Sequence, residues 1–471
     1  MTDLEFPARF LWGAATASYQ IEGGVREGGR GPSIWDTFCA AGGKVLDGAS
    51  GEVACDHYHR YPEDVGLLAG LGLNAYRFSV AWPRVMPDGR TPSAAGLGFY
   101  DRLVDELLAH AVTPVLTLYH WDLPQALEDA GGWPARDTAS RFAEYAAVVH
   151  DALGDRVNQW TTLNEPFCAA FLGYGSGVHA PGHQDHDTAL VAAHHLLLGH
   201  GLATRALTEQ ARPGHEFSLA LNFAPALPDG SSPAHLEAAR KFDGIHNRFF
   251  LDPVLGRGYP ADVLADVAHH GGRFAASVRD GDTDTIAAAI DWLGVNYYAP
   301  ARVTPLADPL APSNCPLPAL RGLDVLPAPG PLTAFGWEQA PGTLTELLRW
   351  IGARSGGLPL VVAENGASFV DEVVDGRVHD EDRVNYYAEH LRAVHDAIRG
   401  GVDVRGYFAW SLLDNFEWAM GYSQRFGLVH VDFETQRRTV KDSGRFLGRV
   451  AKANALPASG APAEGVGDPR A

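Results

Sequence analysis

Short runs of apolar and β-branched residues alternate along this chain with longer stretches whose apolar residues recur about every 3.6 positions. In one such stretch, Phe142, Tyr145, Val149 and Leu153 return to the same face of a helix. Regular alternation of strand and helix predicts a parallel sheet covered by helices. Eight repeats favour a closed α/β barrel, a single (β/α)8 TIM barrel, over an open doubly wound sheet of five or six strands. The eight predicted strands are Phe10–Ser18, Leu73–Trp82, Thr113–Asp122, Val157–Pro166, Phe217–Phe223, Trp292–Tyr298, Leu358–Gly366 and Val404–Asp414.

Several of these runs begin apolar and end in polar or charged side chains. Such groups are costly inside a barrel, but they are typical of the C-terminal rim, where barrel enzymes build their active sites. The pattern therefore predicts a site with long loops at this rim. The polar residues concerned are His120, Asn164, Glu165, Asn222, Asn296, Tyr298, Glu364 and Asn365.

Two segments depart from the repeat. Residues 299–342 contain ten prolines in 44 residues, which is too many for a helix and predicts an ordered surface excursion over the rim. Residues 455–471 have almost nothing to bury, so we expect a disordered tail. No change of composition marks a boundary elsewhere, and we therefore expect one catalytic domain over residues 1–454.

Charge and composition exclude several classes of partner. The net charge of −20 repels nucleic acid and anionic membrane surfaces, and no run approaches the roughly 20 apolar residues of a spanning helix. No secretory signal is visible at the N-terminus. The four cysteines lack CxxC spacing, which is typical of thiols in a reducing compartment. We expect a cytoplasmic protein without a metal, cofactor, nucleic-acid or membrane partner.

Two predicted rim carboxylates, Glu165 and Glu364, lie 199 residues apart at the ends of the fourth and seventh strands. In a closed barrel these strands face each other across the mouth. Two facing carboxyls suit glycosidic cleavage, in which one protonates the leaving oxygen and the other attacks or activates water. Spacing alone also allows a purely structural role in hydrogen bonds at the rim.

The sequence around these residues resembles glycoside hydrolase family 1, the β-glucosidase family. The resemblance runs in order from about residue 4 to residue 450. It is carried by FLWGAATASYQIEGG (10–24), ACDHYHRYPEDV (54–65), YRFSVAWPRV (76–85), YHWDLPQ (119–125), WTTLNEP (160–166), LVVAENG (360–366) and WSLLDNFEW (410–418).

The resemblance implies roles for individual residues. Glu165 of the NEP motif would be the general acid/base, and Glu364 of the ENG motif the nucleophile, in a retaining double displacement. Arg77 and Tyr298 match the family's residues that contact the nucleophile. The sugar-binding positions are matched by Gln20, His120, Asn164, Trp410, Glu417 and Trp418, with Trp121 and Asn296 also expected in the pocket and Trp337 at its entrance against the leaving group.

Family variants can be compared at single positions. Branches that cleave 6-phosphosugars carry Ser, Lys and Tyr where this chain has Glu417, Gln424 and Phe426, and a carboxylate there would repel phosphate. Plant thioglucosidases replace the acid/base with Gln, whereas Glu165 is intact. Ala363 stands before the nucleophile, where Thr is common in the family.

We therefore expect a β-glucosidase that hydrolyses terminal non-reducing β-D-glucosyl residues of small-molecule β-glucosides and cello-oligosaccharides. A preference for β-galactosides or β-fucosides stays open, because the same hydroxyl-binding residues tolerate epimers to different degrees. A non-catalytic sugar-binding barrel is the alternative from another class, and loss of one carboxylate would be its mark.

Overall fold

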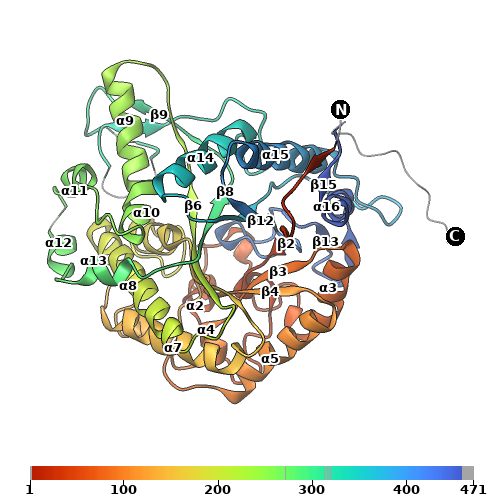
Figure 1. The fold of residues 1–471 in the computed structure, drawn as a ribbon. Helices are drawn as coiled ribbons and strands as arrows, with labels where there is room; N and C mark the ends of the chain where they lie inside the picture. The colour runs from red at the N-terminus through yellow and green to blue at the C-terminus, as the bar shows by residue number, and fades with distance from the viewer. Residues whose placement is uncertain (1–2, 271, 312, 316, 318–319, 459–471) are drawn as a thin grey trace.

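Eight parallel strands close into a barrel in the computed structural model, which describes residues 3–270, 272–311, 313–315, 317 and 320–458. The order around the barrel follows the chain, and β12 closes it by pairing with β2. The predicted fold class is therefore confirmed (Figure 1). The strands are β2 (Leu11–Ala15), β3 (Ala75–Ser79), β4 (Thr113–Tyr119), β5 (Gln159–Asn164), β6 (Glu216–Phe223), β8 (Trp292–Tyr297), β11 (Leu360–Asn365) and β12 (Val404–Trp410).

Seven of the eight predicted runs contain a whole strand, and the run 217–223 lacks only the first residue of β6. Most runs extend past the strand's C-terminal end. The run 113–122, for example, passes three residues beyond β4, and the run 404–414 passes four residues beyond β12. The additional residues begin the loops of the rim, where the backbone leaves the sheet while its side chains remain buried. The predicted strands are therefore longer than the observed ones, because buried loop residues continue the sequence pattern of the strands.

Helices surround the barrel, and the helices next to it bury apolar side chains on their inner faces (Figure 1). The predicted stripe of Phe142, Tyr145, Val149 and Leu153 lies fully buried on α7. The longer helices are α3 (His57–Leu71), α5 (Ala94–Ala109), α7 (Asp137–Leu153), α8 (His186–Glu209), α9 (Pro233–Asp243), α14 (Pro341–Arg354), α15 (Glu381–Arg399) and α16 (Asp442–Ala453). The shorter ones are α1 (Ser18–Ile21), α2 (Ile34–Ala40), η1 (Leu46–Gly48), α4 (Trp82–Val85), α6 (Gln125–Asp129), η2 (Cys168–Ser176), η3 (Gly244–Arg248), α10 (Phe249–Val254), α11 (Ala261–Val267), α12 (Arg273–Ser277), α13 (Asp282–Ile286) and η4 (Trp418–Met420).

Small residues allow large ones to fill the barrel. A Cβ atom added to Gly13 would lie 2.4 Å from the ring of Phe408, and one added to Gly294 would lie 2.9 Å from Ala220. These glycines therefore make room for neighbouring side chains.

The Pro-rich excursion contains ordered structure. Its strands β9 (Ala301–Pro305) and β10 (Leu323–Val325) form a small sheet with β7 (Ala226–Pro228). Arg302 holds the later part of the segment through a two-pronged ion pair with Glu338 at 2.8 Å. The excursion thus brings the residues that follow β10 back to the mouth of the barrel.

The two described ends of the chain lie together. Strand β1 (Leu4–Glu5) pairs antiparallel with β15 (Ala455–Leu456). The tail was predicted to begin at residue 455. This is wrong for Ala455 and Leu456, which are buried and belong to the sheet with β1. Residues 459–471 lie outside the described residues.

A buried ionic cluster anchors the loop after β12. Lys441 Nζ lies 2.5 Å from Asp371 and 2.7 Å from Asp414, and all three side chains are fully buried. Arg383 and Arg425 supply further positive charge, one to each aspartate. The loop passes from Asp414 to the mouth of the barrel, so the cluster fixes its base. A hairpin of β13 (Val429–Val431) and β14 (Arg438–Val440) leads from this loop into α16.

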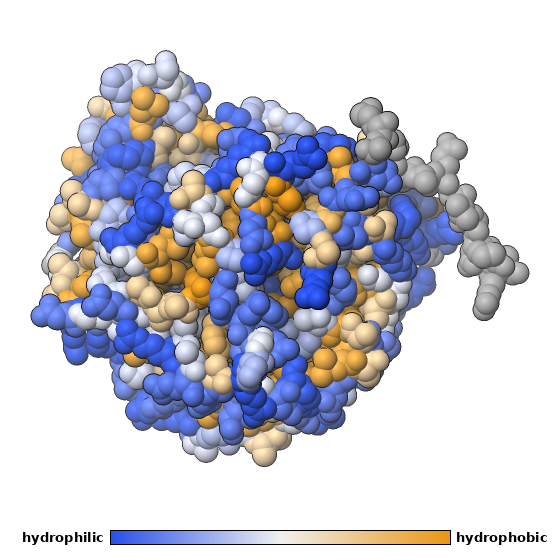
Figure 2. Space-filling view, in the orientation of Figure 1, coloured by the Kyte–Doolittle hydropathy of each residue, from blue (hydrophilic) through white to orange (hydrophobic). Residues whose placement is uncertain are grey.

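The surface seen in Figure 2 is mostly hydrophilic, and hydrophobic residues form separate groups between polar ones. Among the described residues, no helix combines the length and the apolar character needed to span a bilayer.

Candidate active site

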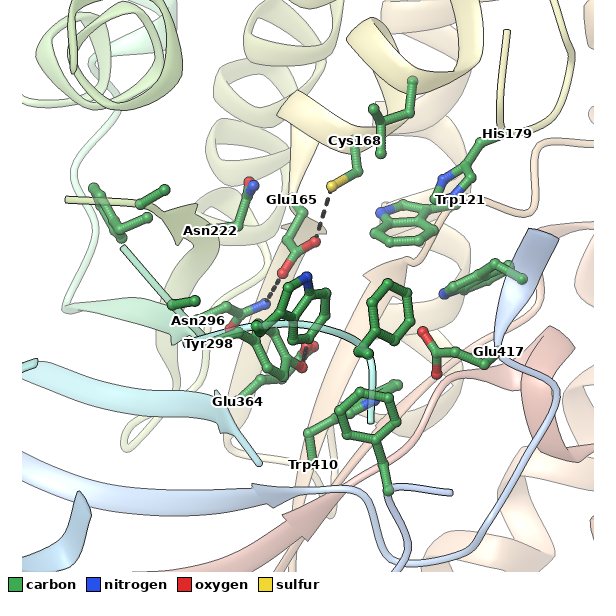
Figure 3. A pocket seen from close by; sticks show the side chains of 18 of the residues that line it. Trp121, Glu165, Cys168, His179, Asn222, Asn296, Tyr298, Glu364, Trp410 and Glu417 are labelled. Atoms are coloured by element: carbon green, nitrogen blue, oxygen red, sulfur yellow. Dashed lines mark hydrogen bonds between the residues drawn. The ribbon is translucent and has the colours of Figure 1, made fainter. Parts of the chain in front are cut away.

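A cavity of about 410 Å³ opens at the C-terminal rim of the barrel. Its walls come from the ends of the strands and from the loops that follow them, including the Pro-rich excursion (Figure 3). The structure brings Glu165, Glu364 and Glu417 into this cavity together with the predicted aromatic residues. A volume in this range suits a small ligand.

Glu165 follows the last residue of β5 and is buried. Its Oε1 accepts a hydrogen bond from Asn296 Nδ2 at 2.7 Å, and its Oε2 accepts one from the Cys168 thiol at 3.1 Å (Figure 3). Burial, followed by the negative charge of Glu364, raises the pKa of Glu165 to about 8. Its two hydrogen-bond partners are uncharged, and the carboxyl is therefore suited to hold a proton at neutral pH.

Glu364 lies on β11 and is held differently. Arg77 Nη1 donates to Glu364 Oε1 at 2.5 Å, and the Tyr298 hydroxyl donates to Oε2 at 2.8 Å. Burial raises the pKa of Glu364, but the Arg77 cation and the hydrogen bond from Tyr298 oppose that rise. The proton shared by the two carboxyls therefore belongs on Glu165, while Glu364 faces a permanent cation and carries the negative charge.

A polar network connects the two carboxyls. Arg77 Nη2 donates to Asn164 Oδ1 at 2.6 Å, and Asn296 Nδ2 donates to the same oxygen at 3.0 Å as well as to Glu165. The backbone oxygen of Asn164 accepts a further bond from Trp121 Nε1 at 3.0 Å. The network connects strands β3, β5 and β8, so the separation of the carboxyls is set by the barrel rather than by mobile loops.

Several buried polar atoms of the pocket lack a hydrogen-bond partner among the described residues. These atoms are Gln20 Oε1, His120 Nδ1, His179 Nδ1, Asn222 Oδ1, His246 Nδ1 and Asn296 Oδ1. A buried polar atom without a partner is costly, and a ligand rich in hydroxyl groups would satisfy such atoms. The pocket is therefore chemically matched to a sugar.

Glu417 supplies a third carboxyl at the far side of the pocket (Figure 3). Gln20 Nε2 lies 3.4 Å from Glu417 Oε2 and also donates to the backbone oxygen of Phe416 at 2.9 Å. Burial, and then the charges of Glu364 and Glu165, raise the pKa of Glu417 to about 8. A protonated Glu417 could both donate to and accept from a hydroxyl group.

Aromatic rings form the remaining walls. The His120 ring lies nearly parallel to Trp410 and to Trp418, with centroids 5.8 and 6.0 Å away, and Trp121 packs 4.6 Å from Trp418. At the entrance, Trp337 contacts Tyr298 at 5.1 Å. Flat apolar surfaces of this kind match the apolar face of a pyranose ring.

The positions that distinguish phosphosugar branches carry no cation. Gln424 accepts a hydrogen bond from Ser368 at 2.9 Å, and Phe426 packs 5.9 Å from Trp337. Together with the carboxyl of Glu417, these groups do not form an anion-binding site.

Three residues of the site adopt a left-handed backbone, which side chains other than glycine rarely adopt. They are Trp121 at φ 74°, Glu165 at φ 45° and Trp418 at φ 50°. Such conformations cost about 1–3 kcal/mol each and cluster at functional sites. Here they turn two aromatic rings and the carboxyl of Glu165 into the pocket.

Sequence reasoning missed several pocket residues. Cys168 lies three residues after Glu165, a spacing that places both side chains on one side of a helical turn. Asn222 was visible as a polar strand end but was given no role. His179 and His246 carried no signal in the sequence, because their loops reach the pocket only in the folded chain.

Histidines 194, 195 and 200 on α8 do not form a metal site. His194 lies 3.0 Å from Asp282, His195 bonds the backbone oxygen of Trp133, and His200 bonds Thr162. Among the described residues, no group of three or more His, Cys, Asp or Glu is arranged to hold a metal ion.

A (β/α)8 barrel with two facing carboxyls at its rim, one beside a cation and one beside neutral groups, defines a class of glycosidic-bond-cleaving enzymes. The model of glycosyl hydrolase family 1 matches residues 2–456. The chain belongs to this family and is a glycoside hydrolase.

Individual relatives are similar over nearly their whole length. The thermostable β-glucosidase B of Thermobispora bispora is 51% identical over 455 residues, which cover 96% of this chain and 92% of that protein. The bifunctional β-D-glucosidase/β-D-fucosidase of Bifidobacterium breve is 48% identical, over 93% of this chain and 96% of that protein. Among solved structures, the psychrophilic β-glucosidase BglU of Micrococcus antarcticus superimposes with a TM-score of 0.91 at 47% identity, over 96% of this chain and all of that one.

Proposed function

We propose that this enzyme is a retaining β-glucosidase that releases terminal non-reducing β-D-glucosyl residues from β-glucosides and cello-oligosaccharides. The observation that carries the proposal is the unequal surroundings of the two carboxyls. Glu364 is bound by Arg77 and Tyr298, whereas Glu165 has only neutral hydrogen-bond partners. One group is thereby prepared to attack and the other to give up a proton.

In the first half-reaction, an oxygen of Glu364 forms a bond with the anomeric carbon while the glycosidic C–O bond breaks. Glu165 transfers its proton to the departing oxygen, so the leaving group departs as a neutral alcohol. The product is a glycosyl ester of Glu364. Arg77 and Tyr298 hold the carboxylate in place for attack.

In the second half-reaction, Glu165 works as a base. Once Glu364 is esterified, its charge no longer raises the pKa of Glu165, which therefore ionises more easily. Glu165 then takes a proton from water as the water oxygen attacks the anomeric carbon and the ester bond breaks. The two carboxyls supply acid, base and nucleophile, so this chemistry requires no cofactor.

Sugar recognition follows from the other walls of the pocket. We assign hydroxyl binding to Gln20, His120, Asn164, Asn296 and Glu417, whose polar atoms line or border the cavity. Trp410, Trp121 and Trp418 supply apolar walls, and Trp337 contacts the leaving group at the entrance. The similarity to relatives named as β-glucosidases supports glucose as the sugar.

A second candidate activity is hydrolysis of β-D-fucosides. The 48% identical relative from Bifidobacterium breve is named for both activities, which favours testing this sugar beside glucose.

Free thiols at all four cysteines suit a reducing compartment and support a cytoplasmic location.

Initial rates on nitrophenyl β-D-glucoside, β-D-galactoside and β-D-fucoside, with cellobiose alongside, test the substrate assignment. We expect the highest kcat/KM for the glucoside or fucoside and measurable release of glucose from cellobiose. A strong preference for the galactoside would overturn the assignment of the sugar.

Replacing Glu364 with Gly tests the nucleophile. We expect hydrolysis to be abolished, and added azide to restore turnover by giving the α-glucosyl azide, since azide then attacks from the side that Glu364 occupied. In Glu165→Ala, azide should instead attack the glycosyl ester and give the β-glucosyl azide. Undiminished turnover in the Glu364→Gly variant would refute the mechanism.

A further inference from the structure

The Cys168 thiol is one of the two side chains that hydrogen-bond Glu165 in the described part of the chain. Its sulfur lies 3.1 Å from Glu165 Oε2, on the opposite side of the carboxyl from Asn296 (Figure 3). Cys168 is 8% exposed and lines the cavity. The thiol is therefore in contact with the proposed acid/base and lies at the edge of the space that a substrate enters.

The chain fixes this thiol by a short-range contact. The backbone N–H of Cys168 donates to the backbone oxygen of Glu165 at 2.9 Å, which forms a single turn after β5. Cys168 then begins η2, a mostly buried helix that packs against α8. This turn holds the backbone of Cys168 beside the carboxyl of Glu165.

The two partners of Glu165 differ in what they can do. Asn296 presents an N–H group, which can only donate, and this group is shared with Asn164. A thiol can donate through its hydrogen and accept weakly through its sulfur. Glu165 must be a carboxylic acid in one half-reaction and a carboxylate in the other. Asn296 can donate to Oε1 in both forms when the proton lies on Oε2, whereas the partner of Oε2 must be able both to donate and to accept, as a thiol can.

We propose that Cys168 is a positioning residue for the acid/base, keeping a hydrogen bond to Oε2 in both protonation states of Glu165 by reversing its direction. The thiol donates to Oε2 when Glu165 is a carboxylate. When Oε2 carries the proton, the sulfur accepts it in the resting enzyme, and the O–H group turns to the leaving oxygen for proton transfer. No proton passes to sulfur. The inference rests on the proposed role of Glu165.

The charges around Glu165 are compatible with this role. Glu364, Glu417, Arg77 and Tyr298 act on it electrostatically, and His120 and His246 border the same cavity. Burial holds the pKa of both histidines well below the usual value, so they add no positive charge near neutral pH. Burial raises the pKa of Cys168, which therefore stays a neutral thiol.

The pH profile of kcat/KM for nitrophenyl β-D-glucoside and cellobiose tests the proposal in Cys168→Ala and Cys168→Ser. Loss of a donor to the carboxylate should move the basic limb of Cys168→Ala upward by about half a unit to one unit. A hydroxyl can also donate and accept, so the basic limb of Cys168→Ser should return to the wild-type position or lie below it. On cellobiose, whose leaving group needs the acid, kcat should fall several-fold further in the Ala variant than on the nitrophenyl substrate.

Cys315→Ala provides the matched control, since Cys315 lies in the Pro-rich excursion and does not line the cavity. Its profile should coincide with that of the wild type. Equal profiles for Cys168→Ala and the wild type, or equal shifts for the Ala and Ser variants, would overturn the proposal. Inactivity of the wild type on these glucosides would instead refute the proposed function, so the two failures are distinguishable.

Discussion

Removing one hydroxyl group from the pocket gives a direct test of how the nucleophile is held. In Tyr298→Phe, Glu364 loses the hydrogen bond of 2.8 Å to Oε2 but keeps Arg77 at 2.5 Å on Oε1. The ring itself, which packs against Trp337, remains. The variant therefore isolates one donor to the carboxylate.

The expected effect of Tyr298→Phe on the pKa of Glu364 follows from the charge of this carboxylate. A hydrogen bond to a charged group contributes about 1.5–3 kcal/mol. Because the Arg77 cation remains, we take the lower end, and about 1.4 kcal/mol corresponds to one pKa unit or a tenfold change in rate. A lost donor disfavours the carboxylate, so the pKa of Glu364 rises and the acidic limb of kcat/KM moves to higher pH by about one unit.

The assay is the pH dependence of kcat/KM on nitrophenyl β-D-glucoside. Tyr297→Phe is a matched control, because the Tyr297 hydroxyl bonds Ala340 and Thr343 outside the pocket. The control should lose stability without moving either limb. An unchanged acidic limb in Tyr298→Phe, with kcat/KM near the wild-type value, would refute the assignment of this hydrogen bond to the nucleophile.

Three further predictions concern the acid, the entrance and the base of the rim loop. Burial and the charge of Glu364 raise the pKa of Glu165 to about 8, so wild-type kcat/KM should fall as the pH rises through about 8. This basic limb should disappear in Glu165→Ala. A basic limb that persists in the variant would belong to another group. Trp337→Ala should raise KM for cellobiose and aryl glucosides more than for methyl β-glucoside, and an equal rise on all three would place this ring outside the leaving-group site. Lys441→Met should lower the free energy of unfolding by about 3–5 kcal/mol, since it leaves buried aspartates without one cation. Denaturant unfolding measures this loss, and the exposed Lys452→Met variant should unfold like the wild type.

Much of the fold could be predicted because the hydrophobic pattern of the sequence repeats with each strand and helix of the barrel. Seven of the eight barrel strands lie within predicted runs, and β6 exceeds its run by one residue. The stripe on α7 is the one expected from its periodicity. Glu165 and Glu364, the proposed catalytic pair, could be placed at the mouth because both follow apolar strand residues in a closed barrel. Prediction was thus strong wherever a local pattern and the barrel's symmetry agreed.

Less could be predicted where contacts join distant segments. His179 and His246 reach the pocket from a loop and from η3, and nothing near them in the chain indicates this. The predicted tail failed at Ala455–Leu456, because their burial depends on pairing with β1, about 450 residues away. The sheet formed by β7, β9 and β10 likewise depends on contacts between separate loops, which proline content alone does not reveal.

The left-handed backbone at Trp121, Glu165 and Trp418 limits how such an enzyme can adapt to temperature. At about 1–3 kcal/mol each, the three conformations together approach the 5–15 kcal/mol by which a whole domain is stable. A glycine would relieve each of them, yet it would remove a ring or the carboxyl from the pocket. Stabilisation of the fold therefore conflicts with the pocket at these three positions, and it is open to the rest of the chain.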